Sequence, residues 1–240
     1  MARVALVTGG TRGIGAAISK ALKAAGHKVA ANYGGNDAAA EKFKSETEIP
    51  VYKWDVSSFD ACAEGIKKVE AELGPVDILV NNAGIAITRG IDDLSEEDFD
   101  RTILVNLKSA FLCTQALLPS MRTRKWGRIV NIGSINGQAG QYGQVNYAAA
   151  KSGIHGFTKA LALEGARVGV TVNAIAPGYI DTDMVAAVPG EVLDKIVAKI
   201  PVGRLGRAQE IARGVAFLCS EDGGFVTGST LSINGGQHMY

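Results

Sequence analysis

The sequence has 240 residues, of which 47% are hydrophobic, and its formal net charge is +1. A near-neutral chain has no general electrostatic attraction to nucleic acid or anionic lipid, so neither is expected as a partner. The first apolar run is too short for a signal peptide, and no apolar segment approaches the roughly 18 residues of a membrane span, which predicts a cytoplasmic protein. The three cysteines and three histidines show no metal-ligand spacing, so no metal site is expected. The length suits one α/β domain over residues 1–240.

Short runs rich in β-branched residues alternate with longer helical patterns along the chain. They predict strands at 3–8, 27–33, 50–56, 76–82, 127–134, 170–177 and 230–234. Segments between them, such as GIGAAISKALKAAG, place apolar residues at i, i+3 and i+4 and end at a glycine. This alternation predicts a Rossmann-type α/β fold, a doubly wound parallel sheet of seven strands flanked by helices. Ligands of such sheets bind beyond the carboxyl ends of the strands, so the chemistry is expected there.

The first predicted strand leads into GGTRGIG, residues 9–15, which opens an alanine-rich helix. Its glycines allow the backbone to approach a phosphate, and a helix N-terminus offers unpaired N–H groups. The spacing differs from the common GxGxxG fingerprint, and a glycine turn can serve packing alone. Its place after the first strand of an alternating chain favours dinucleotide binding.

The end of the second predicted strand bears on the choice between NAD and NADP. Asn32 and Tyr33 stand where an acid would accept from the 2′-hydroxyl of NAD, and the first acid, Asp37, follows a Gly-Gly pair. Arg12, inside the glycine loop, is placed to pair with a 2′-phosphate; the alternative is a solvated loop arginine. These residues predict NADP(H) as the cofactor.

The stretch SINGQAGQYGQVNYAAAKSG, which begins at Ser134, gathers hydroxyls, amides and one ammonium without an acid, His or Cys. Tyr147 and Lys151 are four residues apart and share one helix face, where an ammonium favours the phenolate and lowers the phenol pKa. Tyr142 has Asn146 at the corresponding position instead. Ser134 ends the fifth predicted strand, from which its hydroxyl can lie beside the phenol. A serine nucleophile is the alternative, but GxSxG and a nearby activating group are missing, so carbonyl reduction fits better.

Taken together, these motifs make the chain resemble the short-chain dehydrogenase/reductase family over its whole length. The matching pieces are TGGTRGIG (8–15), NNAG (81–84), Asn106 in LVNL, Ser134, YAAAK (147–151) and APG (176–178). The resemblance implies an oxidoreductase in which Tyr147 protonates the nascent alkoxide and Ser134 binds the carbonyl oxygen. Lys151 would lower the tyrosine pKa and bind the nicotinamide ribose. Asn106 would kink its helix and hold a proton-relaying water, unless it is a capping or core amide.

The same resemblance implies the cofactor contacts. The glycine loop would hold the phosphates, NNAG would flank the adenine ribose, and the APG turn would orient the nicotinamide. Asp55 would lie near the adenine, although a turn residue at a strand end is an alternative. The implied residues are Gly9, Thr11, Arg12, Gly13, Ile14, Gly15, Asp55, Val56, Asn82, Ala83, Gly84, Tyr147, Lys151, Pro177, Gly178, Ile180 and Thr182.

Within the family, the resemblance is closest to bacterial 3-oxoacyl thioester reductases. These comprise acetoacetyl-CoA reductases of polyhydroxybutyrate synthesis and 3-oxoacyl-[acyl carrier protein] reductases of fatty-acid synthesis. NGQAGQYGQVNYAAAKSGIHGFT, PGYIDTDM and NGGQHMY look more like the former, which implies reduction of acetoacetyl-CoA to (R)-3-hydroxybutyryl-CoA. Gln141, Tyr142 and Gln144 would bind the thioester and Tyr179 would close the pocket, unless they are loop residues facing water. A non-catalytic NADP-binding regulator is the alternative from another class, but it has little need for the complete catalytic set.

Two further segments bear on partners. The helical patterns at 97–124 and 146–164 resemble helices that pair in a four-helix interface in this family, which implies a homotetramer. MRTRKWGR, residues 121–128, concentrates four basic residues around Trp126. This cluster is either a solvated helix end or a landing site for an anionic substrate carrier, such as CoA or an acyl carrier protein.

Overall fold

The structure, a computed structural model, describes residues 2–182, 185 and 190–239. Its centre is a parallel sheet of seven strands in the order β3-β2-β1-β4-β5-β6-β9. The strands are β1 Val4–Val7, β2 Lys28–Tyr33, β3 Val51–Lys53, β4 Val76–Asn81, β5 Gly127–Ile132, β6 Val170–Pro177 and β9 Thr230–Ile233. Each lies within or overlaps a predicted strand, so the predicted doubly wound α/β fold is confirmed.

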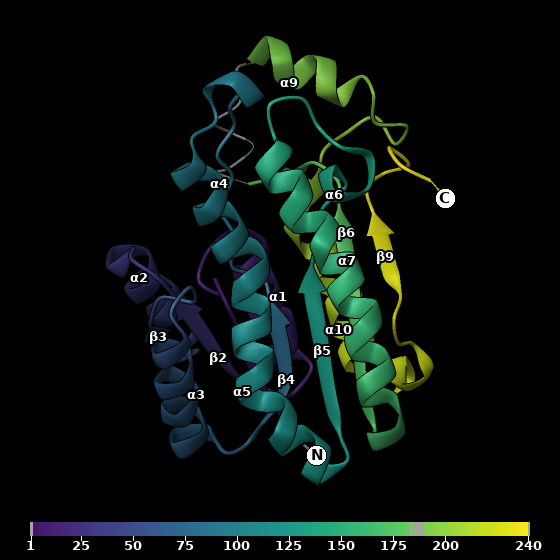
Figure 1. Cartoon of the computed structure of the whole chain (residues 1–240). Coiled ribbons are helices and arrows are strands. Elements are labelled where there is room, and N and C mark those ends of the chain that lie inside the picture. The colour runs from purple at the N-terminus through teal and green to yellow at the C-terminus, as the bar shows by residue number, and fades with distance from the viewer. Residues whose placement is uncertain (1, 183–184, 186–189, 240) are drawn as a thin grey trace.

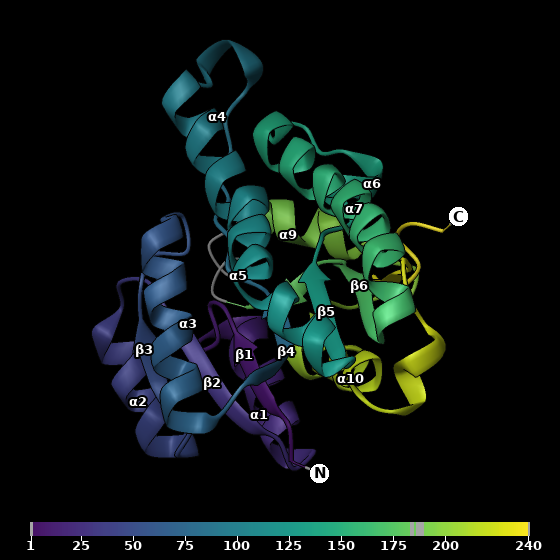
Figure 2. The same ribbon diagram turned by 60° about the horizontal axis from the view of Figure 1, so that its bottom comes forward.

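Helices cover both faces of the sheet and make three layers (Figure 1). One face carries α3 Phe59–Leu73, α5 Ser109–Arg124 and α7 Val145–Gly165. The other carries α1 Gly13–Ala24, α2 Asp37–Thr47 and α10 Ala208–Cys219. Figure 2 shows α3, α5 and α7 on one side of the sheet and α1 and α10 on the other. The short helix α6 Asn136–Ala139, the helix α9 Gly190–Val197 and the start of α4 Glu96–Ile103 lie near the carboxyl ends of the strands (Figure 1).

The alternation of side chains along each strand divides the core into two layers. Leu6 and Leu79 belong to the layer under α3, α5 and α7, whereas Val7 and Val80 belong to the layer under α1 and α10. The inner strands β1, β4, β5 and β6 are buried along their whole length. Strands buried on both faces have continuous apolar sequences, which is why composition alone located them.

The predicted long helix at 97–124 is helical from Glu96 to Arg124. By length and composition this stretch could cross a membrane, contrary to the sequence-based expectation, and 50% of its most apolar window is buried inside the protein. Its α5 part packs on β4, β5 and α3, which is the position of a core helix. A π-helical turn, η2 Leu104–Lys108, interrupts it between α4 and α5.

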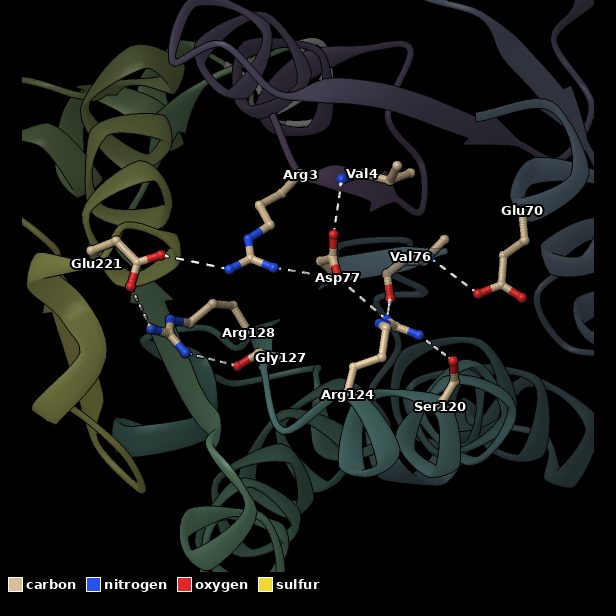
Figure 3. Close-up of polar contacts among 10 residues, drawn as sticks. All are labelled: Arg3, Val4, Glu70, Val76, Asp77, Ser120, Arg124, Gly127, Arg128 and Glu221. Atoms are coloured by element: carbon tan, nitrogen blue, oxygen red, sulfur yellow. Dashed lines mark hydrogen bonds and ion pairs between the residues drawn. The ribbon is translucent and has the colours of Figure 1, made fainter. Parts of the chain in front are cut away.

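The basic cluster around Trp126 lies at the amino-terminal edge of the sheet (Figure 3). Arg124 donates to the carbonyl of Val76 at 2.7 Å and pairs with Asp77 at 3.3 Å. Arg128 is only 4% exposed, and its guanidinium lies 4.4 Å from the centre of the Trp126 ring. These contacts hold Arg124 and Arg128 in place, and β5 runs from this end of the sheet to the predicted site at its other end, which argues against a landing site for a substrate carrier. Lys125 is exposed, as the solvated helix end predicts. A solvated helix end is wrong for Arg128.

Candidate active site

The glycine loop between β1 and α1 has a backbone that leaves room for a phosphate. Gly9 and Gly13 have φ angles of 62° and 51°, which favour glycine. A Cβ on Gly15 would lie 2.1 Å from the carbonyl oxygen of Gly9, so that position excludes any side chain. No side chain caps the start of α1, and its first turn holds no acid. Its N–H groups are thus available to an anion, which fits the phosphates of the implied cofactor.

Asn82 holds this loop in place. Its side-chain Nδ2 donates to the carbonyls of Thr8 at 2.9 Å and Gly9 at 3.2 Å. The hydroxyl of Thr8 in turn accepts from the backbone N–H groups of Asn82 and Ala83. The NNAG segment after β4 therefore lies against the glycine loop, as the implied cofactor contacts require. The sequence alone did not show that Asn82 acts through the backbone of the loop.

The end of β2 holds no free acid that faces the glycine loop. Asn32 is 1% exposed, and its Oδ1 accepts from the N–H of Gly9 at 3.3 Å. The acid beyond the Gly-Gly pair, Asp37, lies 2.8 Å from Lys53 Nζ and accepts from the Tyr33 hydroxyl at 3.0 Å. The hydrogen bond from Lys53 lowers the pKa of Asp37. The charge of this acid is therefore balanced within its own cluster.

Ser134, Tyr147 and Lys151 come together at the carboxyl end of β5. Ser134 follows this strand and is 8% exposed, while Tyr147 and Lys151 lie on the first turns of α7. Ser134 and Tyr147 are joined by a side-chain hydrogen bond. Lys151 Nζ donates to the carbonyl of Ile132 at 2.8 Å and lies 5.6 Å from the centre of the Tyr147 ring. The topology thus brings together the three side chains that the sequence pattern predicted to form the site.

The pKa of Tyr147 differs from the sequence-based expectation. Burial raises it, and the hydrogen bond from Ser134 opposes this increase. Lys151 was expected to lower it, but the lysine is itself 4% exposed, and burial lowers its own pKa to about 8. Its ammonium is directed to the carbonyl of Ile132. Burial therefore decides the direction of both shifts, and the expected lowering of the phenol pKa is wrong for this structure.

Asn106 lies in the π-helical turn and is 3% exposed. Its Nδ2 donates to the carbonyls of Ile85 and Thr102, both at 2.9 Å. Its Oδ1 is buried without a hydrogen-bond partner in the structure. A Cβ on Gly84 would lie 2.6 Å from this Oδ1 and 3.6 Å from Lys151 Nζ. This acceptor and the lysine ammonium therefore both lie next to Gly84, which fits the implied relay water between them; the expected kink takes the form of a π-helical turn.

The segment after β6 leads back to the glycine loop. The carbonyl of Pro177 accepts from the N–H of Ile135 at 2.9 Å, which joins this segment to the one that carries Ser134. A Cβ on Gly13 would lie 3.7 Å from the Thr182 side chain, so the two predicted cofactor segments meet there. Ile180 lies in a two-stranded sheet, β7 Ile180–Asp181 with β8 Gly206–Arg207, which the sequence analysis missed. The PGYIDTDM motif extends into residues 183–184, outside the described residues.

Asp55 has a structural role in the turn after β3. Its Oδ1 accepts from the N–H and the hydroxyl of Ser57 at 2.9 and 2.7 Å. Val56 beside it is 7% exposed and belongs to the core. The turn-residue alternative is therefore observed for Asp55, while an adenine contact stays a prediction.

The four predicted substrate residues do not form one group. Gln141 is exposed and Tyr142 is 92% exposed, so both lie at the outer rim. Gln144 and Tyr179 lie deeper and share a neighbour, Asn136, whose amide donates to Gln144 Oε1 at 2.8 Å and hydrogen-bonds the Tyr179 phenol. Sequence reasoning missed Asn136, although this amide stands two residues after Ser134 in the stretch that drew attention.

Comparison with known proteins shows that the chain is similar to reductases over nearly its whole length. The family model described as enoyl-(acyl carrier protein) reductase matches residues 9–238. Acetoacetyl-CoA reductase from Rhizobium meliloti (strain 1021) is 63% identical over 240 residues, 100% of both chains. Acetoacetyl-CoA reductase from Paracoccus denitrificans is 59% identical over 239 residues, 99% of both chains. The 3-oxoacyl-[acyl-carrier-protein] reductase of Escherichia coli (strain K12) is 44% identical over 241 residues, 99% of this chain and 98% of that one.

The family match covers almost all of the chain, and these relatives are similar over their full length. The sheet order, the glycine loop and the Ser134–Tyr147–Lys151 group point to the same family as the comparisons. The chain belongs to the short-chain dehydrogenase/reductase family and is an oxidoreductase.

Proposed function

We propose that this enzyme reduces the 3-oxo group of acetoacetyl-CoA to (R)-3-hydroxybutyryl-CoA with NADPH, as a step that supplies polyhydroxybutyrate synthesis. The observation that carries the reaction type is the meeting of Ser134, Tyr147 and Lys151 at the carboxyl end of β5. The choice of substrate is supported by the names of the relatives from Rhizobium meliloti and Paracoccus denitrificans.

When bound at the glycine loop, a reduced nicotinamide would supply the hydride that the carbonyl carbon of the substrate accepts. The Ser134 hydroxyl binds the carbonyl oxygen, which keeps the reacting carbon beside the cofactor. The Tyr147 phenol donates its proton to the alkoxide, so the product leaves as an alcohol. Tyr147 regains the proton through Lys151 and a water held at Asn106 Oδ1, the buried acceptor that has no hydrogen-bond partner among the described residues. The hydride on carbon and the proton on oxygen together convert the ketone to the alcohol.

The preference for NADPH is supported at the end of β2. Asp37 is paired with Lys53 and bonded to Tyr33, so its charge does not oppose a 2′-phosphate from that position. Arg12 is exposed on the glycine loop and can pair with such a phosphate. We propose that the remaining implied cofactor residues, including Asp55 and Val56, also contact NADPH when it binds.

We also propose that the chain acts as one domain over residues 1–240 and as a homotetramer in the cytoplasm. Phe111 on α5 is 45% exposed and Leu163 on α7 is 83% exposed, on two helices that the sequence analysis assigned to an interface. Burial of such side chains by a second copy is favourable.

The second candidate substrate is a 3-oxoacyl thioester of acyl carrier protein, which the 44% identical relative from Escherichia coli supports. Steady-state kinetics with NADPH on acetoacetyl-CoA and on the matching carrier-protein thioester decide between the two. We expect the larger kcat/KM for acetoacetyl-CoA. A value about tenfold larger for the carrier-protein substrate, about 1.4 kcal/mol in transition-state binding, would assign the enzyme to fatty-acid synthesis. The Tyr147→Phe variant gives the background rate for both assays.

A further inference from the structure

Asn136 occupies a position that connects three of the groups already described. It is the first residue of α6, two residues after Ser134. Its backbone N–H donates to Ser134 Oγ at 3.1 Å, and its side-chain Nδ2 donates to Gln144 Oε1 at 2.8 Å. The same side chain hydrogen-bonds the phenol of Tyr179. We propose that Asn136 is a positioning and specificity residue, which orients the Gln144 amide toward the thioester end of the substrate. This inference rests on the proposed function, since it assumes a 3-oxoacyl thioester.

The bond from Asn136 fixes which way the Gln144 amide points. Because Gln144 Oε1 accepts from Asn136, the Nε2 group lies on the other side, where it donates to Thr88 Oγ1 at 3.3 Å. An amide nitrogen carries two hydrogens, so one remains for a further acceptor. A thioester offers only acceptors, its carbonyl oxygen above all. The orientation set by Asn136 thus presents a donor, which is the group that a thioester requires.

The same contacts join loops that follow three different strands. Thr88 lies after β4, Asn136 after β5 and Tyr179 after β6. A backbone bond from the Arg89 N–H to the Gly143 carbonyl at 2.8 Å reinforces the first of these junctions. Backbone bonds hold these loops together, and the Asn136 side chain sets the orientation of the Gln144 amide between them. Loss of its donor is expected to change substrate binding more than cofactor binding, because the glycine loop lies outside this network.

Asn136 also contacts Ser134, through its backbone. Its Oγ accepts from the Asn136 N–H, so the hydroxyl hydrogen is directed elsewhere, toward Tyr147 or a substrate oxygen. This donor belongs to the backbone and survives a side-chain substitution. Substitution of the Asn136 side chain consequently separates the two roles: substrate orientation is lost, and the bond to Ser134 is kept.

The test uses Asn136→Asp, which preserves size but replaces the donor with an acceptor. Gln144 must then turn its amide to donate to residue 136, and its oxygen faces the thioester oxygen. We expect KM for acetoacetyl-CoA to rise about tenfold, about 1.4 kcal/mol, with kcat changed less than threefold and NADPH affinity unchanged. Calorimetric binding of acetoacetyl-CoA to a Tyr147→Phe protein with and without Asn136→Asp should show the same loss without turnover.

A double-mutant cycle tests whether Asn136 affects substrate binding through Gln144. In a Gln144→Ala background, Asn136→Asp should raise KM by less than twofold, because the group through which it acts is already gone. Gln138→Ala is the matched control: it removes an amide from the same short helix, where Gln138 bonds to Ser232 at 3.1 Å, and should leave KM within twofold. Additive effects of Asn136→Asp and Gln144→Ala would overturn the inference.

The outcomes also separate this inference from the proposed function. If the unmodified enzyme reduces neither thioester, the proposed function fails. If it reduces acetoacetyl-CoA and Asn136→Asp keeps the original KM, only the role of Asn136 fails. Should Asn136→Asp not fold, Asn136→Ala replaces it, and an unchanged KM there is equally decisive against the inference.

Discussion

At the scale of single residues, Tyr142 in the loop before α7 and Tyr147 at the start of α7 differ in what surrounds their phenols. Tyr147 is bonded to Ser134 and lies beside Lys151, whereas Tyr142 is 92% exposed. Tyr147→Phe deletes the proton donor alone, so kcat should fall by about 10²- to 10⁴-fold while NADPH binds as before. Tyr142→Phe should keep most of the turnover, with any change in KM. Steady-state kinetics and NADPH fluorescence titration check this, and two equally inactive variants would contradict the assignment of the donor.

The buried ammonium of Lys151 lowers the free energy of unfolding of the protein. Burial lowers its pKa in the folded protein to about 8, below the unfolded value of about 10.4. Between these values the unfolded state holds the proton and the folded state does not, so the free energy of unfolding rises with pH over this window. Below pH 8 the penalty for the buried ammonium is fully present.

Lys151→Met should therefore stabilise the cofactor-free protein at pH 7 by about 1–3 kcal/mol while abolishing activity. The lost hydrogen bond to the Ile132 carbonyl keeps the gain below the full penalty. The gain should shrink as the pH rises from 8 toward 10. Urea unfolding at pH 7 and pH 9.5 measures both values, and an equal gain at the two pH values would show that the buried charge is not its cause.

At the scale of elements, the glycine loop and the end of β2 together select the cofactor. Arg12→Ala removes the cation available to a 2′-phosphate, so the preference for NADPH over NADH should fall by about 1.5–3 kcal/mol. Dissociation constants for both cofactors give this quantity directly. Lys20→Ala removes an exposed cation from α1, outside the loop, and should leave the preference unchanged. Equal affinity of the unmodified protein for the two cofactors would refute the NADP assignment.

Elements with a long apolar signal could be predicted from the sequence, and short or irregular ones could not. The inner strands β1, β4, β5 and β6 are largely apolar because helices cover both faces of the sheet. The two-residue strands β7 and β8 are too short to show any periodicity. The π-helical turn around Asn106 keeps the helical periodicity of its neighbours, so the pattern predicted one helix without the interruption.

The candidate site divides in the same way. Tyr147 and Lys151 lie on one helix, so their spacing in the sequence placed them together. Asn136 and Thr88 meet Gln144 from separate loops, and no local pattern records such a contact. The pKa directions of Tyr147 and Lys151 depend on burial, which only the packed structure provides. Spacing along one helix and position at a strand end could be predicted from the sequence, which placed Tyr147, Lys151 and Ser134 together. Contacts between separate loops and the effect of burial on pKa could not.

At the scale of the whole molecule, the two ends of the sheet have different tasks. The carboxyl ends of the strands carry Ser134 and the glycine loop, and the amino-terminal edge carries a network of ion pairs (Figure 3). Asp77 is the acid at its centre: it is 8% exposed, accepts from the N–H of Val4 and lies 3.3 Å from Arg124. A separation of this kind predicts that stability can be changed without changing catalysis.

Asp77→Ala should lower the free energy of unfolding by about 2–4 kcal/mol, because it leaves the Val4 N–H without its side-chain acceptor and Arg124 without its acidic partner in a largely buried place. The values of kcat and KM below the unfolding range should remain within twofold, since Asp77 lies near the start of β4 and the site lies at the opposite ends of the strands. Lys42→Ala is the control, for it breaks a solvated pair with Glu46 and should cost less than about 0.5 kcal/mol. Urea unfolding and steady-state kinetics on the same preparations measure both properties. A loss of kcat in Asp77→Ala under conditions where the protein is fully folded would mean that the two ends of the sheet are coupled.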